Sequence, residues 1–282
     1  MQVIVTGATG FVGRYVVSAL LARQHTVTAV VRNPETAEQL PWFEQVKFIS
    51  SDLGKLNRNV REQLGQADLI VHLAWPGLPN YRGLFHFEKN LPEAYSFLSA
   101  AIKEGYSRLL VVGTCFEYGR QQGCLREDLN TLPDNPYGLA KDILRKFLEL
   151  LQHEHPFTLQ WCRLFYMFGA GQNPKSLLAQ LDAAMERGDD TFPMSGGEQI
   201  RDFLPVTEIA RRLVQLIEHP EAEGVFNICS GQPISIRKLV ENHIREVGGQ
   251  IKLQLGVYPY PDYEPFAFWG DTSKYSNFEH QL

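Results

Sequence analysis

Tyr137 and Lys141 stand four residues apart, a spacing that places both side chains on one face of a helix. Asn135 is expected to cap that helix and Pro136 to begin it, which puts Tyr137 in the first turn. The ammonium can then lie near the phenol and, together with a positively charged nicotinamide, favour the phenolate. Such a pair suits proton transfer. It is also common on exposed helix faces, so its weight comes from the other motifs.

A hydroxyl side chain follows an apolar run earlier in the chain. Residues 109–112 are predicted to form a buried strand, and Thr114 lies just beyond it in the stretch Gly113-Thr114-Cys115-Phe116-Glu117-Tyr118-Gly119. At that strand end a hydroxyl could share a substrate carbonyl oxygen with the Tyr137 phenol and polarise it for hydride attack. The alternative is a threonine that only caps the strand.

A glycine-rich stretch near the start of the chain predicts a phosphate-binding turn. It lies between a β-branched run at residues 3–6 and apolar residues at helical spacing. Backbone amides at a helix N-terminus can hold a phosphate only where side chains stay clear, which glycines permit. In this context a dinucleotide is favoured over a simple turn. The residues expected to contact it are Gly7, Thr9, Gly10, Phe11, Val12 and Gly13.

The end of the second predicted strand bears on the choice of cofactor. NAD binding uses a carboxylate there for the ribose 2′-hydroxyl, but this chain has Arg32 and no acid before Glu35. An arginine suits the 2′-phosphate of NADP, so we expect NADP; the alternative is a solvated arginine. Asp52, followed by Leu53, ends the third strand. It could reach the adenine amino group or only cap the strand.

The elements that must position these residues alternate between strand and helix. Predicted strands cover residues 3–6, 26–31, 46–49, 69–73, 109–112 and 159–165, and predicted helices cover 12–23, 93–103 and 137–153. Strands that are apolar on both faces and separated by helices indicate a parallel sheet covered on both sides. The sequence therefore predicts an α/β fold with a doubly wound parallel sheet of the Rossmann type, and a smaller C-terminal α/β region.

The character of the chain changes beyond Gly169, where glycine, proline and polar clusters separate shorter elements. We predict an NADP-binding domain over residues 1–170, completed by about 203–230, with a strand at 225–228 that returns to the main sheet. The substrate-binding domain is predicted over 171–202 and 231–282, with a helix at 235–247. Its aromatic tail at 258–269 either closes over the nucleotide base or sugar, or only packs.

Composition excludes several classes of protein. The 282 residues are 44% hydrophobic and 21% charged, with a formal net charge of −5 and no Lys/Arg block. This argues against nucleic acid or an anionic membrane as partner. No apolar run is long enough to span a membrane and no signal-peptide pattern occurs, so a cytoplasmic location is expected. The spacing of the four cysteines matches neither a zinc site nor a redox motif, so we expect reduced thiols and no metal.

Taken in order, these motifs resemble the extended short-chain dehydrogenase/reductase superfamily, in its nucleotide-sugar branch, over nearly the whole chain. Two further stretches match, Arg163–Gly171 and Arg201–Val206. The resemblance implies that Thr114, Tyr137 and Lys141 are the catalytic set. It also implies that His72, Leu73 and Ala74 line the cofactor cleft, and that Arg201 contacts the substrate diphosphate.

Departures from the family pattern narrow the reaction. The 4,6-dehydratases have an acid and a base directly after the threonine, where this chain has Cys115 and Phe116, which disfavours elimination. Glu117 stands one position further on and is expected to point elsewhere. Tyr166 stands where many members have an asparagine that touches the substrate. Phe116 and Tyr166 are therefore expected on the substrate side.

The resemblance is strongest to reductases that use NADPH on a nucleoside-diphosphate 4-keto-6-deoxyhexose, with a TDP-linked sugar favoured, to make deoxysugars for bacterial surface polysaccharides or glycosylated metabolites. Arg32 favours such a net reductase. One alternative is a C4 epimerase that keeps its NAD bound. Others are a reductase of a non-sugar carbonyl and, in another class, a non-catalytic NADP-sensing protein. A homodimer through the two helices that flank the site is expected from the resemblance.

Overall fold

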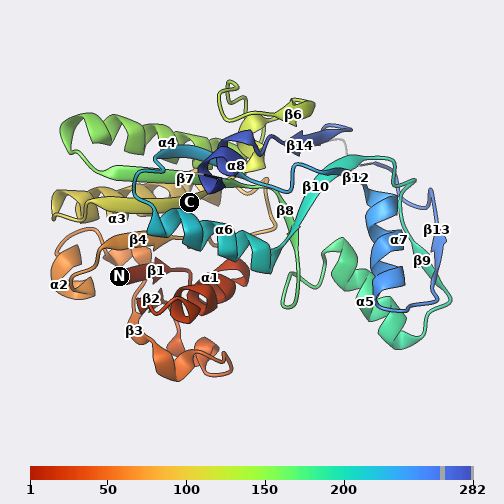
Figure 1. Ribbon diagram of the computed structural model, residues 1–282, viewed down its shortest axis with the longest axis horizontal. Helices are drawn as coiled ribbons and strands as arrows, with labels where there is room; N and C mark the ends of the chain where they lie inside the picture. The colour runs from red at the N-terminus through yellow and green to blue at the C-terminus, as the bar shows by residue number, and fades with distance from the viewer. Residues whose placement is uncertain (261–263, 281–282) are drawn as a thin grey trace.

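A seven-stranded parallel sheet forms the centre of the computed structural model, which describes residues 1–260 and 264–280 (Figure 1). Its strands are β1 (Gln2–Thr6), β2 (Thr26–Val31), β3 (Lys47–Ser50), β4 (Leu69–His72), β5 (Arg108–Thr114), β7 (Thr158–Leu164) and β11 (Gly224–Ile228). They lie in the order β11-β7-β5-β4-β1-β2-β3. The chain winds from β1 outward in both directions, which confirms the predicted doubly wound fold.

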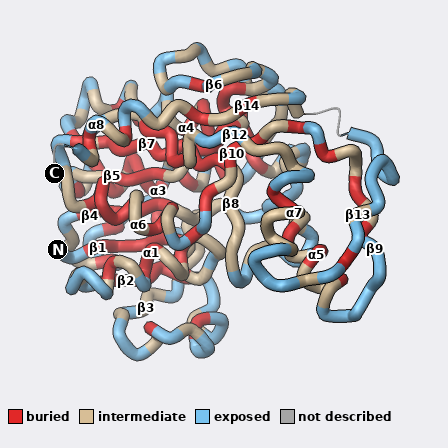
Figure 2. The backbone as a smooth tube through the Cα atoms, turned by 45° about the vertical axis from the view of Figure 1, so that its right-hand side comes forward, coloured by how far each residue is buried: buried red, intermediate tan, exposed pale blue. Residues whose placement is uncertain are grey.

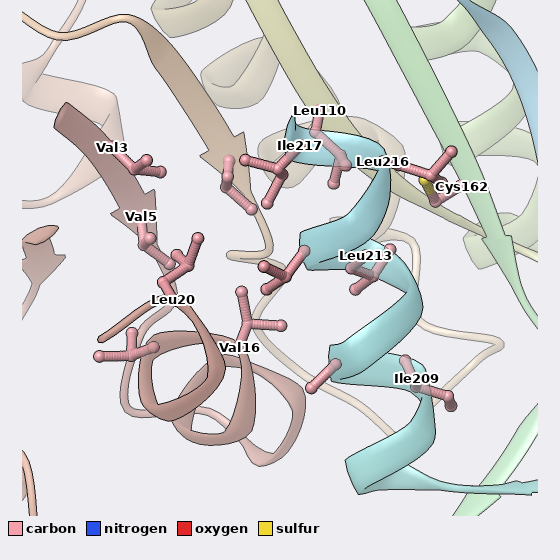
Figure 3. Close-up of a cluster of buried hydrophobic side chains, with 14 of the residues drawn as sticks. Val3, Val5, Val16, Leu20, Leu110, Cys162, Ile209, Leu213, Leu216 and Ile217 are labelled. Carbon is pink, nitrogen blue, oxygen red and sulfur yellow. The ribbon is translucent and has the colours of Figure 1, made fainter. Parts of the chain in front are cut away.

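Helices cover both faces of this sheet because successive strand residues point to opposite sides. They are α1 (Phe11–Ala22), α2 (Val60–Leu64), α3 (Leu91–Lys103), α4 (Pro136–Glu154), α6 (Val206–Glu218) and α8 (Ser273–Glu279). Val3 and Val5 belong to a cluster with side chains of α1 and α6, as Figure 3 shows. Ile4, between them, belongs to the cluster on the α3 and α4 face. The sheet is thus buried on both sides, and its polar loops collect at its edges.

A smaller part of the structure lies beyond the end of β7. Strands β8 (Tyr166–Phe168), β10 (Ile200–Pro205) and β12 (Pro233–Ser235) form a mixed sheet, and β9 (Thr191–Pro193) pairs with β13 (Lys252–Gln254). Helices α5 (Leu177–Arg187) and α7 (Ile236–Glu246) pack here around their own small core. Figure 2 shows this second buried group at a distance from the sheet. The expected C-terminal α/β region is therefore present.

Several predicted elements agree with the structure within a few residues. The strand expected at 225–228 is β11, which returns to the edge of the main sheet beside β7, and the helix expected at 235–247 is α7. Part of the aromatic tail forms β14 (Phe268–Gly270), paired with β6 (Gly123–Leu125). Tyr263, also in that tail, lies outside the described residues. No helix in the described ranges is long and apolar enough to cross a membrane.

Two irregular turns beside the predicted site were not predicted from the sequence. A π-helical turn, η4 (His86–Asn90), precedes α3, and a 3-10 turn, η5 (Cys115–Tyr118), follows β5. The predicted strand at 109–112 extends to Thr114, so that the hydroxyl stands at the last strand position. Both turns lie next to the predicted site, which is the position where irregular backbone is common.

Candidate functional site

The turn between β1 and α1 brings three chain segments into close backbone contact. Gly7 has a φ of +71°, and a Cβ atom there would lie 2.7 Å from the backbone nitrogen of Ala74. A Cβ atom on Gly13 would lie 2.1 Å from the carbonyl oxygen of Gly7. Larger residues are excluded at both positions, because the turn packs directly on α1 and on the end of β4. Leu73 and Ala74 therefore lie beside the glycine turn, and that they line the cofactor cleft stays a prediction.

The N-terminus of α1 carries hydrogen-bond donors that the protein does not use. Its cap, Gly10, has no side chain to satisfy them, and the first turn holds no acidic residue. The N–H groups of Phe11, Val12 and Gly13 donate no hydrogen bond to any described part of the chain. Free amides at a helix N-terminus, cleared by glycines, fit the pyrophosphate of a dinucleotide.

The neighbouring strand ends carry the residues predicted for the adenosine side. Arg32 is exposed beyond β2, and its guanidinium has no hydrogen bond or ion pair within the described ranges. The hydroxyl of Ser50 donates to the Arg32 carbonyl at 3.1 Å, which ties the ends of β2 and β3 together. Asp52 accepts from the Gly54 N–H at 3.4 Å and so caps the turn η3 (Leu53–Lys55). Asp52 thus caps the turn that follows the strand, and its contact with the adenine amino group stays a prediction.

Thr114 and Tyr137 come from different elements and meet at the edge of the sheet. Asn135 accepts from the Gly138 N–H at 2.9 Å and caps α4, and Pro136 is the first residue of the helix. Tyr137 therefore sits in the first turn, and its phenol lies close enough to the Thr114 hydroxyl for the hydroxyl to influence the pKa of the phenol. That the two hydroxyls share a substrate carbonyl oxygen stays a prediction. Both side chains are buried, at 5% and 7% relative exposure.

Burial moves the pKa values of Tyr137 and Lys141 in opposite directions. Desolvation raises the pKa of the Tyr137 phenol, so the phenol is neutral at neutral pH. Desolvation lowers the pKa of Lys141 to about 7, opposed by the nearby Glu117 carboxylate. The Lys141 ammonium donates to the Val112 carbonyl at 2.8 Å and lies 4.0 Å from the centre of the Trp75 ring. That Lys141 lowers the Tyr137 pKa stays a prediction.

Glu117 holds the turn that carries Thr114. Its carboxylate accepts from the Thr114 N–H at 2.9 Å, from the Trp161 indole at 3.0 Å and from the Arg163 guanidinium at 2.7 Å. Glu117 is fully buried, so its charge must be compensated within the protein, by these donors and by the Arg145 guanidinium, whose Nε lies 3.9 Å from the carboxylate. It points into the protein and away from the Tyr137 phenol, as the sequence led us to expect. Its role here is to fix Thr114 at the strand end.

On the substrate side, Tyr166 and Arg201 meet around one acidic residue. The Tyr166 hydroxyl donates to Glu264 at 2.7 Å, and the Arg201 guanidinium donates to the same carboxylate at 2.8 Å. Arg201 is almost fully buried and also lies 4.7 Å from the centre of the Phe268 ring. Phe268 of the aromatic tail therefore packs against Arg201. Contact between Arg201 and a diphosphate stays a prediction, and Glu264 had no signal in the sequence.

An aromatic group surrounds Tyr137 and was largely missed. The rings of Trp75, Tyr81 and His86 lie 6.3, 5.6 and 5.2 Å from the Tyr137 ring, measured between ring centres. Phe116, expected near the substrate, packs at 4.8 Å on Tyr81. Trp75 follows directly on the residues expected to line the cleft, which was a usable signal. His86 had none, because only the fold of the 75–90 segment brings it to the site.

The sheet order, the free amides at the glycine turn and the phenol–hydroxyl pair are those of a dinucleotide-dependent oxidoreductase. The chain belongs to the NAD dependent epimerase/dehydratase family, whose model matches residues 3–229. A nicotinamide dinucleotide is therefore the cofactor that fits this site. Within the described ranges, no group of three His, Cys, Asp or Glu side chains could hold a metal ion.

Individual relatives agree with this assignment. The chain is 32% identical, over 96% of its own length and 99% of the relative's, to a dTDP-6-deoxy-L-talose 4-dehydrogenase (NAD(+)) from Aggregatibacter actinomycetemcomitans. Its fold is similar to that of a UDP-glucuronic acid 4-epimerase from Bacillus cereus solved with UDP-glucuronic acid and NAD. That match has a TM-score of 0.83 and 25% identity, and covers 98% of this chain and 92% of the other.

We expect Glu117→Gln to destabilise the fold by about 3–5 kcal/mol, because it leaves the buried Arg163 guanidinium without its charged partner. Chemical denaturation monitored by circular dichroism measures this loss. The matched control is Asp128→Asn, which removes the exposed ion pair of Asp128 with Arg126 and should leave the unfolding midpoint nearly unchanged. Equal midpoints for the two variants would contradict the role given to Glu117.

Proposed function

We propose that this protein reduces the 4-keto group of a TDP-linked 4-keto-6-deoxyhexose with NADPH. The observation that carries the proposal is that Thr114 and Tyr137 are buried close together, in surroundings that keep the phenol protonated. A neutral phenol is the state that a proton donor to a carbonyl oxygen requires. The relative with 32% identity supports the substrate class, since its name describes oxidation at position 4 of a dTDP-linked 6-deoxyhexose.

The residues that follow Thr114 do not support an elimination reaction of the kind that 4,6-dehydratases carry out. The positions that would supply an acid and a base hold Cys115 and Phe116. Burial raises the pKa of the Cys115 thiol, so it remains neutral and unreactive at neutral pH. Glu117 is committed to Thr114, Trp161 and Arg163. A reductase needs none of these groups as a proton carrier.

In the proposed mechanism the hydroxyls of Thr114 and Tyr137 hold the carbonyl oxygen of the substrate between them. When bound, the reduced nicotinamide supplies the hydride to the carbonyl carbon. Tyr137 then donates its proton to the oxygen that becomes the alcohol, and the Lys141 ammonium and Thr114 hydroxyl stabilise the phenolate that remains. We propose that Lys141 also holds the nicotinamide ribose. The free amides of Phe11, Val12 and Gly13 would hold the pyrophosphate.

The proposed substrate-binding domain consists of residues 171–202 and 231–282. It is supported by Arg201, which stands on β10, and by Tyr166 and Glu264, which meet it there. We propose that Arg201 contacts the diphosphate. Charge-assisted hydrogen bonds from a guanidinium match the geometry of phosphate oxygens. The nucleotide and sugar would therefore extend from this domain to Tyr137, with Phe116 on the substrate side.

Epimerisation at C4 is the second candidate. It is favoured by the likeness in fold to a UDP-glucuronic acid 4-epimerase solved with NAD. An epimerase returns the hydride to the same substrate, so it would act without added cofactor. A non-catalytic NADP-sensing protein is a weaker candidate, because such a protein has no use for a buried phenol close to a threonine hydroxyl.

The purified protein should oxidise NADPH when supplied with TDP-4-keto-6-deoxyglucose, and Tyr137→Phe should lower kcat by about 100- to 10,000-fold, because the proton donor is lost. Loss of absorbance at the reduced-nicotinamide band measures both rates. Tyr95→Phe, which removes a phenol hydroxyl from α3, is the matched control. Full activity of Tyr137→Phe would refute the assigned role. Epimer exchange without added cofactor would favour the second candidate.

Arg32 should determine the preference for NADPH over NADH. Arg32→Asp should raise the KM for NADPH by about 10- to 100-fold, because a charge-assisted hydrogen bond to the 2′-phosphate is lost and a repulsive charge is introduced. Steady-state kinetics with both cofactors test this, with Arg58→Asp as a surface control. Preference of the wild-type protein for NADH, the reduced form of the cofactor named for the relative, would overturn the NADP assignment.

We further propose a cytoplasmic homodimer in which α3 and α4 of two copies meet. The support is an apolar stripe on α4, where Leu139, Phe147 and Leu150 are exposed and Phe147 packs on Tyr95 of α3. Phe147→Glu should convert a dimer to a monomer in light scattering coupled to gel filtration, because a charge would be buried in the interface. Leu132→Glu, at an exposed loop residue, should not. A monomeric wild-type protein would contradict the proposal.

A further inference from the structure

His86 is a fully buried histidine whose two ring nitrogens both have partners. Its Nδ1 lies 3.0 Å from the indole nitrogen of Trp75, and its Nε2 lies 2.7 Å from the carbonyl oxygen of Asn80. An indole N–H can only donate and a carbonyl oxygen can only accept. The imidazole must therefore carry its proton on Nε2 and accept the indole proton at Nδ1. The two contacts together select one neutral tautomer.

Protonation of His86 would break this arrangement, because it would set an N–H at Nδ1 against the indole N–H of Trp75. Burial and the charge of Lys141 lower the pKa of His86, in agreement with a ring that stays neutral. The segment that bears the pair is also fixed, since the Asn90 amide donates to the Pro76 carbonyl at 2.9 Å. The position of the Trp75 ring is therefore determined by His86.

The Trp75 ring in turn lies against the two residues to which chemistry was assigned. Its centre is 4.0 Å from the Lys141 ammonium and 6.3 Å from the centre of the Tyr137 ring. The ammonium is almost completely removed from water. Its other attractive contacts are the Val112 carbonyl and, at longer range, the Glu117 carboxylate. The indole face supplies a cation–π attraction where hydration is absent.

We propose that Trp75, held in place by neutral His86, is a positioning residue that keeps the Lys141 side chain charged and beside Tyr137. This inference rests on the proposed function, which assigns the chemistry to Tyr137 and Lys141. It adds that the charge of the lysine depends on an aromatic face and a histidine from the segment after β4. Neither residue needs to touch the reacting atoms.

The other titratable groups around Lys141 determine whether a loss of charge near pH 7 can be assigned to the lysine. They are Tyr137 on α4, Glu117 in η5, His72 at the end of β4 and His86 in η4. The pKa of His72 is lowered to about 3, and the Tyr137 pKa is raised. Glu117 is held by its own donors. Loss of charge near pH 7 therefore belongs to Lys141, whose pKa is about 7.

The experiment compares Trp75→Leu with Trp75→Phe, which differ in whether an aromatic face remains. The first readout is the pH at which kcat falls on the alkaline side. Trp75→Leu should move that limb to lower pH by about one unit, since loss of the cation–π contact favours the neutral amine. Trp75→Phe should keep it near the wild-type position. Phe48→Leu, on β3 and packed on Trp42, is the matched control and should not move it.

The second readout needs neither cofactor nor substrate. The carbon-13 shift of the Lys141 Cε atom, followed against pH by nuclear magnetic resonance of lysine-labelled protein, reports the deprotonated fraction of its amine. The midpoint should be lower in Trp75→Leu than in Trp75→Phe. In the wild-type protein, nitrogen-15 shifts of the His86 ring should show the neutral Nε2–H tautomer at pH 6. A charged ring or the other tautomer would overturn the inference.

The two hypotheses can fail separately. If Tyr137→Phe is fully active, the proposed function fails, while the titration midpoint of Lys141 still tests Trp75. If Trp75→Leu and Trp75→Phe give the same midpoint and the same alkaline limb as the wild type, the inference about Trp75 is wrong, whatever the reaction is. If Trp75→Leu does not fold, His86→Leu replaces it. That variant removes the acceptor of the indole and should lower the midpoint in the same direction.

Discussion

The buried carboxylate of Glu117 is the constraint on which the site depends. A charge without water must be matched by donors, and here the donors are the Thr114 N–H, the Trp161 indole and the Arg163 guanidinium. Trp161 and Arg163 belong to β7, whereas Thr114 ends β5, so one side chain joins the ends of adjacent strands. Thr114 is thereby fixed at the end of β5, next to the first turn of α4, which carries Tyr137.

Burial also changes the pKa values of the two neighbouring side chains, Tyr137 and Lys141. The same low-polarity surroundings raise the pKa of the Tyr137 phenol and lower that of the Lys141 ammonium, because each shift favours the neutral form. A phenol that keeps its proton suits donation to a carbonyl oxygen. A lysine near the point of deprotonation depends on every group that stabilises its charge, and for Lys141 these groups include Glu117 and the Trp75 ring.

The glycine turn and the cluster around Arg201 differ in how their hydrogen-bond donors are used. At the N-terminus of α1 the protein leaves amide donors unused and has no side chains that would cover them. Around Arg201 the guanidinium is held by Glu264, by backbone carbonyls and by the Phe268 ring. Arg201 is therefore oriented by partners within the protein.

The sequence by itself determined the doubly wound sheet, the glycine turn and the cap of α4, and it singled out Thr114 and Tyr137 as candidate residues of one site. These features rest on short-range rules: alternation along strands, helical spacing, glycine where backbones touch, and a fixed edge at which parallel strands end. Only the tertiary structure decided the places of Trp75, His86 and Glu264. Glu264 is far from Arg201 in the chain, and His86 reaches Tyr137 through an irregular turn. Their contacts depend on how loops fold onto the edge of the sheet. The hydrophobic periodicity of a sequence describes helices and strands and does not predict how loops fold.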